Sequence, residues 1–76
     1  MHEIRLTCSL FDVEVRLREF NGRWIASADM PDGPPTLGWG MSALGALWFA
    51  LEPFGGLIDE LLASLPDEVA VTLERS

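Results

Sequence analysis

Cysteine and histidine are scarce in this sequence and lysine is absent, and each shortage excludes a class of site. Cys8 is the sole cysteine, so no disulfide can close within the chain. One histidine and one cysteine leave no ligand cluster for a zinc site, and we expect no metal and no cofactor. This cysteine usage favours a cytoplasmic location.

Positive charge is also scarce. Twelve acidic residues stand against five basic ones, all arginine, and the formal net charge is -7 at pH 7. A field of this sign repels phosphate groups, which disfavours direct contact with nucleic acid or an anionic membrane. We therefore expect no nucleic-acid partner and no membrane partner, and we favour a basic protein partner.

Long apolar runs are missing as well. The longest apolar tract, 43–51, is far shorter than the roughly 20 residues of a membrane-spanning helix, and no basic-then-apolar leader opens the chain. The chain has 76 residues, 49% hydrophobic and 22% charged, which is typical of a packed globular protein with room for one core. We expect a single domain over residues 1–76.

The N-terminal part shows the period-two alternation of apolar residues that is typical of β-strands. The alternation changes phase once, between Ile4, Leu6, Cys8 and Leu10 on one side and Phe11, Val13, Val15 and Leu17 on the other. A one-residue change of phase turns the apolar side chains to the opposite face of a sheet. Residues 9–12 are therefore expected to hold a bulge or a bend between a short strand and a longer one.

Asn21-Gly22 predicts a β-hairpin, because both central residues of a type I′ turn need positive φ. A two-residue loop places Phe20 opposite Arg23, and counting outward from that pair sorts the side chains onto two faces. The expected core face carries Val13, Val15, Leu17, Trp24, Ala26 and Ala28, and the expected solvent face carries Asp12, Glu14, Arg16, Arg18, Ile25 and Ser27. Ile25 should therefore be more exposed than Ala26.

A helix is predicted after the hairpin. Segment 29–35 contains three prolines and is expected to be a connection, followed by a brief extended piece over 36–39 and by Ser42 as helix N-cap. The apolar stripe of the helix is formed by Leu44, Leu47, Trp48, Leu51, Ile58, Leu62 and Leu65. The stripe keeps its phase across Pro53. Either one helix continues to about Ser64 with a kink at 51–53, or two helical pieces share an axis.

After Pro66 the apolar residues Val69, Val71 and Leu73 alternate again and predict a last strand. The expected fold class is α+β: an antiparallel sheet of three to four strands with one helix packed on one face, in the order β-β-β-α-β. Trp24 and Trp48 are assigned to the core.

Three short motifs over residues 24–51 carry a resemblance to a known family. They are Trp24-Ile25-Ala26, Asp29-Met30-Pro31-Asp32-Gly33 and the run 40–47, which begins Gly40-Met41-Ser42. In this order they resemble the second strand, the Asp-Leu-Pro-Gly turn with one residue inserted, and the helix start of the N-terminal domain of HicB-type antitoxins. The likeness is close over 24–51 and follows the order of elements over most of the rest.

The resemblance implies a partial ribonuclease H-like fold and a domain that neutralises a small basic ribonuclease toxin by covering its active site. Gly45 departs from the pattern, because the family usually has a glutamate there that completes a capping box with Ser42. Family members that repress their own operon also carry a C-terminal DNA-binding domain. We expect this chain to lack one, so DNA binding is not carried over.

Catalysis is not expected. General acid–base chemistry needs carboxylates that face each other across a pocket, whereas the adjacent acidic pairs at 59–60 and 67–68 are expected in solvent. His2 adjoins the N-terminus, where a frayed end is expected. Metal-dependent chemistry of the ribonuclease H type needs a carboxylate cluster on the strands, and only Asp12 and Glu14 are available.

Two surfaces are candidates for binding. Arg16, Arg18, Arg23 and Phe20 share the solvent face of the hairpin, where arginines beside an aromatic ring suit RNA. Two acids share that face, so a mixed-charge outer face is the favoured interpretation, a protein contact the second and nucleic acid the third.

Trp39, between two glycines, either caps a pocket or closes the core, and core closure is favoured.

The second surface surrounds Phe49, nearly opposite the apolar stripe and near Ala46, Pro53 and Leu57. A helix on a sheet should show one polar face, and the first half of this helix has almost none. We expect this side to pack against another copy as a homodimer. The alternative is that a distorted helix buries Phe49 within the monomer.

Two functional hypotheses follow. The leading one is a non-catalytic protein-binding domain, a stand-alone HicB-like antitoxin that binds a small basic toxin. The alternative is an orphan homo-oligomeric domain that binds a small ligand between the Trp39 loop and the helix.

Overall fold

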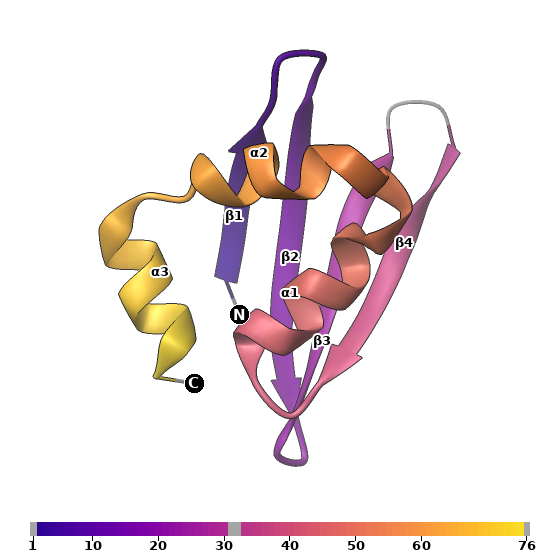
Figure 1. The fold of residues 1–76 in the computed structure, drawn as a ribbon. Coiled ribbons are helices and arrows are strands. Elements are labelled where there is room, and N and C mark those ends of the chain that lie inside the picture. The colour runs from indigo at the N-terminus through magenta and orange to yellow at the C-terminus, as the bar shows by residue number, and fades with distance from the viewer. Residues whose placement is uncertain (1, 31–32, 76) are drawn as a thin grey trace.

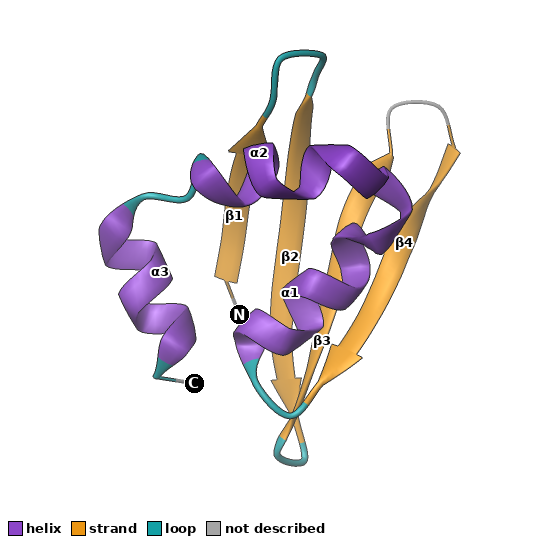
Figure 2. Cartoon of the chain, viewed as in Figure 1, coloured by secondary structure: helices purple, strands orange, loops and turns teal. Residues whose placement is uncertain are grey.

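A computed structural model describes residues 2–30 and 33–75 (Figures 1 and 2). Four strands come first: β1 (His2–Thr7), β2 (Asp12–Phe20), β3 (Arg23–Met30) and β4 (Gly33–Gly40). Helical segments follow: α1 (Ala43–Leu51), the 3-10 segment η1 (Glu52–Leu57), α2 (Ile58–Ala63) and α3 (Asp67–Glu74). Pro31 and Asp32, in the expected connection, lie outside the described residues.

The strands form one antiparallel sheet in the order β1-β2-β3-β4, and α1 and α2 lie over one face of it (Figure 1). The α+β class with helix packed on one face of an antiparallel sheet is confirmed. The predicted order β-β-β-α-β is wrong, because all the strands described precede the helices. β4 is longer than the extended piece predicted over 36–39, and its two prolines are tolerated because it is an edge strand.

The central hairpin has the predicted register. Asn21 and Gly22 have φ of 54° and 76°, and Phe20 pairs with Arg23, as a type I′ turn requires. The expected core face is buried, and Ala26 is fully buried whereas Ile25 is half-buried. Turn chemistry and the apolar pattern thus set which face of the sheet receives the helices.

The change of phase near residue 9 is a second hairpin and not a bulge within one strand. β1 pairs with β2 along its whole length, from His2 opposite Leu17 to Thr7 opposite Asp12. The chain reverses over residues 8–11, where the Cys8 N–H donates to the Phe11 carbonyl oxygen at 3.0 Å. His2 is not a frayed end, because it lies in β1 with its ring stacked on Trp24, centroids 6.0 Å apart.

The core lies between the sheet and the helices. Its buried members are Ile4, Leu6, Val13, Val15, Leu17, Trp24, Ala26, Ala28, Ala43, Ala46, Leu47, Ala50, Leu51, Leu61 and Leu73. Trp24 is in this core as expected, but Trp48 is 46% exposed, so its assignment to the core is wrong. Small residues of α1 face the sheet instead, which lets this helix sit close to β4.

The helical stretch is broken and does not share one axis. Ser42 caps α1 as predicted, its Oγ accepting the Gly45 N–H at 3.0 Å. α1 ends at Leu51, Pro53 lies in the first turn of η1, and Gly55 has φ 57°, outside the helical region. α2 then crosses the sheet in a different direction from α1 (Figure 1). A break near 51–53 was expected from Pro53, but the change of direction also needs Gly55.

Residues 67–74 form α3, so the predicted last strand is wrong. Pro66 precedes the helix, and Asp67 and Glu68 stand in its first turn, where negative charge is favourable at the positive end of the helix dipole. Leu73 is buried while Val71 is 47% exposed. This separation follows the helical period and not the strand period, because a strand would place both on one face.

Within residues 2–30 and 33–75, no helix has the length and apolar character needed to cross a membrane.

Candidate functional site

The segment 33–51, which forms β4 and α1, contains no charged residue. Five large hydrophobic side chains in it are exposed: Leu37, Trp39, Met41, Trp48 and Phe49. We call these five residues the uncharged surface. Pairs of them share hollows: Trp39 with Met41, Leu37 with Phe49, and Trp48 with Phe49. Exposed apolar side chains that lie together are typical of a protein or ligand contact.

Trp39 reaches solvent because of the glycines on either side of it. A β-carbon at Gly38 would overlap the Ala46 carbonyl oxygen and the Ala50 nitrogen, and one at Gly40 would lie 2.6 Å from the Ala46 nitrogen. Since successive strand residues face opposite ways, glycines toward the helix leave Trp39 on the open face of the sheet. Trp39 is 56% exposed, so the expectation that it closes the core is wrong.

Two shallow hollows border the Trp39 side chain. One is lined by Phe20, Asn21, Arg23, Ile25 and Trp39, and the other by Arg23, Trp39, Gly40 and Met41. Both lie on the sheet side. The candidate pocket is therefore formed with hairpin residues of β2 and β3, and not with the helix as expected.

The structure separates the four helix residues of the expected interface. Phe49 is 55% exposed and lines one hollow with Pro53, Leu37 and Glu52, so burial of Phe49 within the monomer is excluded. Ala46 is fully buried against the sheet, which removes it from any interface. Leu57 is half-buried and packs on the core. Phe49 and Pro53 remain together, and Leu37 joins them from β4.

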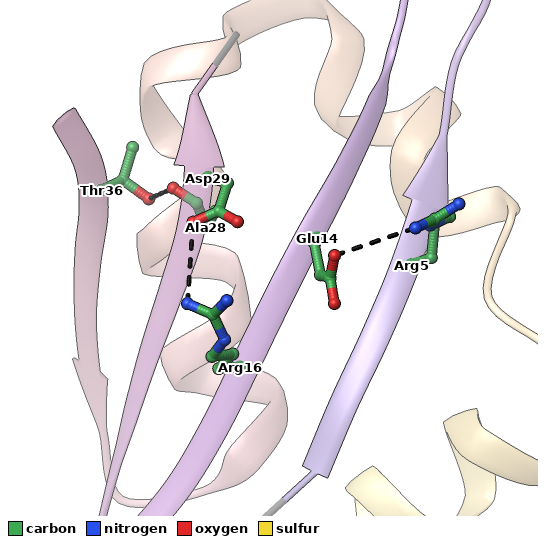
Figure 3. A network of polar contacts seen from close by, with 6 residues as sticks. All are labelled: Arg5, Glu14, Arg16, Ala28, Asp29 and Thr36. Carbon is green, nitrogen blue, oxygen red and sulfur yellow. Dashed lines mark hydrogen bonds and ion pairs between the residues drawn. The ribbon is translucent and has the colours of Figure 1, made fainter. Parts of the chain in front are cut away.

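The open face of the sheet brings together Arg16, Arg18, Phe20 and Arg23, as the register predicts. Two exposed ion pairs lie on this face: Arg5 with Glu14 at 3.8 Å and Arg16 with Asp29 at 3.9 Å (Figure 3). In the part of the chain that the structure describes, Arg18 and Arg23 have no ion-pair partner. The face therefore has paired charges between β1 and β2 and between β2 and β3, and among the described residues it leaves Arg18 and Arg23 unpaired near the 21–22 turn.

Acidic residues dominate the helical side. Residues 43–76 contain six acids, Glu52, Asp59, Glu60, Asp67, Glu68 and Glu74, against the single base Arg75. All six acids are exposed, and we call them the acidic helical surface. Glu60 also has a structural role, because its Oε1 accepts the Ser9 N–H at 2.6 Å and holds α2 to the first turn.

The acidic residues considered for catalysis do not come together at one site. Asp12 is exposed at the start of β2, and Glu14 is engaged with Arg5. Among residues 2–30 and 33–75, no group of three His, Cys, Asp or Glu side chains is placed to hold a metal ion. Cys8 is half-buried, and its thiol donates to the Phe11 carbonyl oxygen at 3.4 Å.

Leu37 and Met41 were missed as members of a surface, although the sequence carries a signal for them. The stretch 33–51 contains no charged residue, which is unusual for a segment that contacts only solvent. The glycines at 38 and 40 mark the helix-facing positions of β4, and Leu37 and Trp39 alternate with them. These two observations together place Leu37 and Trp39 on the open face.

Comparison with protein-family models, with curated proteins and with solved structures gives no match to this chain.

Proposed function

We propose that this chain is a non-catalytic protein-binding domain of the HicB-like antitoxin type, which neutralises a small basic ribonuclease toxin. The observation that carries the proposal is the acidic helical surface, with six exposed acids and one arginine in residues 43–76. A surface of one sign speeds encounter with a partner of opposite sign and fixes its orientation. A cytoplasmic location and self-association, both expected from the sequence, stay predictions.

The resemblance behind this proposal rests on short motifs, two of which lie wholly within the described residues. The motif Trp24-Ile25-Ala26 lies in β3, and the run 40–47 joins β4 to α1 with Ser42 as the N-cap. The helix start is where the resemblance implies it, whereas β3 is the third strand of the chain and the resemblance implies the second. Gly45 leaves the Ser42 cap without the reciprocal glutamate, so α1 depends on its packing against β4.

The mechanism is steric and electrostatic. A ribonuclease holds the phosphates of its substrate through basic groups, and carboxylates that pair with those groups compete with RNA for them. The acids of η1, α2 and α3 would meet the basic active-site region of the toxin, while the rest of the domain blocks RNA. Inhibition of this kind weakens as salt rises, because exposed charges are screened.

The test is capture of proteins from a lysate of the source organism with two tagged variants of equal charge change. The first neutralises the helical side (Glu52→Gln, Asp59→Asn, Glu74→Gln), and the second neutralises the strands (Glu3→Gln, Asp12→Asn, Glu19→Gln). We expect the wild type and the strand variant to retain a small basic protein that salt releases, and the helical variant to lose it. The captured protein should cleave RNA, and added wild-type chain should stop the cleavage.

Equal capture by both variants, or a captured protein whose ribonuclease activity the chain leaves unchanged, would contradict the proposal.

A second candidate is an orphan homo-oligomeric domain that binds a small ligand beside Trp39. The observation in its favour is the hollow that Trp39 shares with Phe20 and with Arg23, whose guanidinium has no ion-pair partner among residues 2–30 and 33–75. Aromatic walls and a free guanidinium suit a small planar anion. Titration with aromatic carboxylates should change tryptophan fluorescence in the wild type but not in Arg23→Ala. No change in either protein would remove this candidate.

A further inference from the structure

We infer that two copies of this chain join through the free edge of β4, antiparallel about a two-fold axis, so that their sheets become one continuous sheet. The inference goes beyond the proposed function and does not depend on it. It rests on the main-chain groups at the edge, on the distribution of charge and on the nature of the opposite edge.

The first observation concerns hydrogen bonding along β4, which pairs with β3 on one side only. A two-residue turn makes Phe20 and Arg23 a hydrogen-bonded pair, and such pairs recur at every second residue. The residues of β3 that turn their main-chain groups toward β4 are therefore Trp24, Ala26 and Ala28, and their partners are Gly40, Gly38 and Thr36.

Leu37 and Trp39 alternate with those partners, so their N–H and C=O groups point away from the sheet. An edge strand with free main-chain groups is a template for another strand. Pro35 comes just before this stretch and has no N–H to offer, which confines pairing to the residues that follow it.

The second observation explains why the added strand belongs to a second copy. In a two-fold interface the same surface meets itself, so a surface with an excess of charge of one sign is repelled by its copy. The chain carries a net charge of -7, yet residues 33–51 carry no charge at all. The uncharged surface is therefore the place where two such chains meet without repulsion.

A two-fold axis at Gly38 satisfies these constraints. It sets Leu37 opposite the partner's Trp39, and the two residues exchange main-chain hydrogen bonds and pack on the open face. Phe49 shares a hollow with Leu37, Pro53 and Glu52, so we expect its ring to lie beside the junction on the helix side. Both faces of the joined sheet thus bury apolar side chains that each monomer leaves exposed.

The third observation limits the assembly to two copies. The opposite edge of the sheet is β1, whose open face carries the exposed charged residues Glu3 and Arg5. Charged edge strands resist pairing with another strand. Joining through β4 therefore leaves no edge on which the sheet would grow.

The test is amide hydrogen exchange on the wild-type chain at several concentrations, with the oligomeric state measured by light scattering. We expect a dimer in which the amides of Leu37 and Trp39 exchange about tenfold more slowly once about nine-tenths of the chain is dimeric, since exchange then needs the monomer. The inward-facing amides of Gly38 and Gly40 should be protected at all concentrations. Monomers up to about 1 mM, or a dimer in which Leu37 and Trp39 exchange freely, would overturn the inference.

A pair of variants at position 37 distinguishes the contribution of the main-chain N–H to dimerisation from that of the side chain. Leu37→Pro removes an outward N–H that the monomer does not use, and Leu37→Ala removes the same side chain but keeps the N–H. We expect Leu37→Pro to be a folded monomer, with Gly38 and Gly40 still protected, at concentrations where Leu37→Ala is still partly dimeric. Identical oligomeric states for the two variants would contradict pairing through this edge.

Discussion

The strand half and the helical half of this molecule handle charge in opposite ways. Residues 1–42 contain six acids and four bases, a net charge of -2, whereas residues 43–76 contain six acids and one base, a net charge of -5. The ion pairs found among residues 2–30 and 33–75, Arg5 with Glu14 and Arg16 with Asp29, lie in the strand half. The strands thus neutralise much of their own charge, while the helices carry an excess of negative charge.

Between these halves lies the contact of α1 with β4, which is made largely by main chain and small side chains. Gly38 and Gly40 face Ala46 and Ala50 so closely that no β-carbon fits at either glycine. The Thr36 hydroxyl also donates to the Ala50 carbonyl oxygen at 2.8 Å. The two halves are therefore held together at a site that has no charge and little tolerance for volume.

The largest loss of stability is expected from a substitution in the contact of α1 with β4. Gly38→Val places side-chain atoms against the main chain of α1, which cannot move without losing its position on the sheet. We expect the free energy of unfolding to fall by about 3 kcal/mol or more, the upper end of overpacking effects. Urea unfolding followed by tryptophan fluorescence measures it. Gly33→Ala is the control, because nothing lies within 4 Å of a β-carbon there; equal stability of the two variants would contradict the close contact.

A substitution within the helical half alone should cause a smaller loss of stability. Leu73 is 1% exposed and Val71 is 47% exposed, so Leu73→Ala should lower the unfolding free energy by about 2–3 kcal/mol and Val71→Ala by well under 1 kcal/mol. Thermal unfolding of both variants measures the difference. Equal losses would mean that both side chains lie on one buried face, as a strand would place them, and α3 would be the wrong description.

Breaking an ion pair of the strand half should have the smallest effect. Arg5 and Glu14 are 3.8 Å apart with side chains 67% and 39% exposed, so their interaction is screened by solvent. A double-mutant cycle with Arg5→Ala and Glu14→Ala should give a coupling below about 0.5 kcal/mol that vanishes in high salt. A larger coupling would show that the strand charges contribute to stability as well as to neutrality.

Local signals predicted the strand half well. The Asn21-Gly22 turn and the alternating apolar residues are both short-range features, and together they predicted the register of the hairpin and the exposure of Ile25. The change of phase near residue 9 was seen but was interpreted as a bulge or bend. The local sequence does not distinguish a bulge from a full reversal of the chain when the turn lacks a residue with positive φ.

The helical half depended on contacts that a single pattern does not contain. Three apolar residues at period two over 69–73 also fit one turn of helix, since Val69 and Leu73 are four apart. The orientation of α1 was predicted in part, because Leu47 and Leu51 of the expected stripe are buried but Trp48 was wrongly placed on that side. Close approach to Gly38 and Gly40 instead selects Ala46 and Ala50 for that side and turns Trp48 and Phe49 to solvent.

The same dependence limited prediction of the candidate surfaces. The arginines of the hairpin and Phe49 were found from register and helical position, which need only local geometry. Leu37 and the open-face position of Trp39 depend on which side of β4 receives the helix. That choice is made by the glycines at 38 and 40, which are a signal in the sequence, but their close contact with α1 is seen only in the structure.

The glycine-lined contact of α1 with β4 also implies that nearby positions differ in the kind of substitution they tolerate. Positions 38, 40, 46 and 50 should accept almost no substitution in any assay, because each change there disturbs folding. Positions 37, 39 and 49 should accept many substitutions in an assay of folding and few in an assay of association. A saturation library read by both assays would therefore separate the residues that this domain needs to fold from those proposed to join two copies.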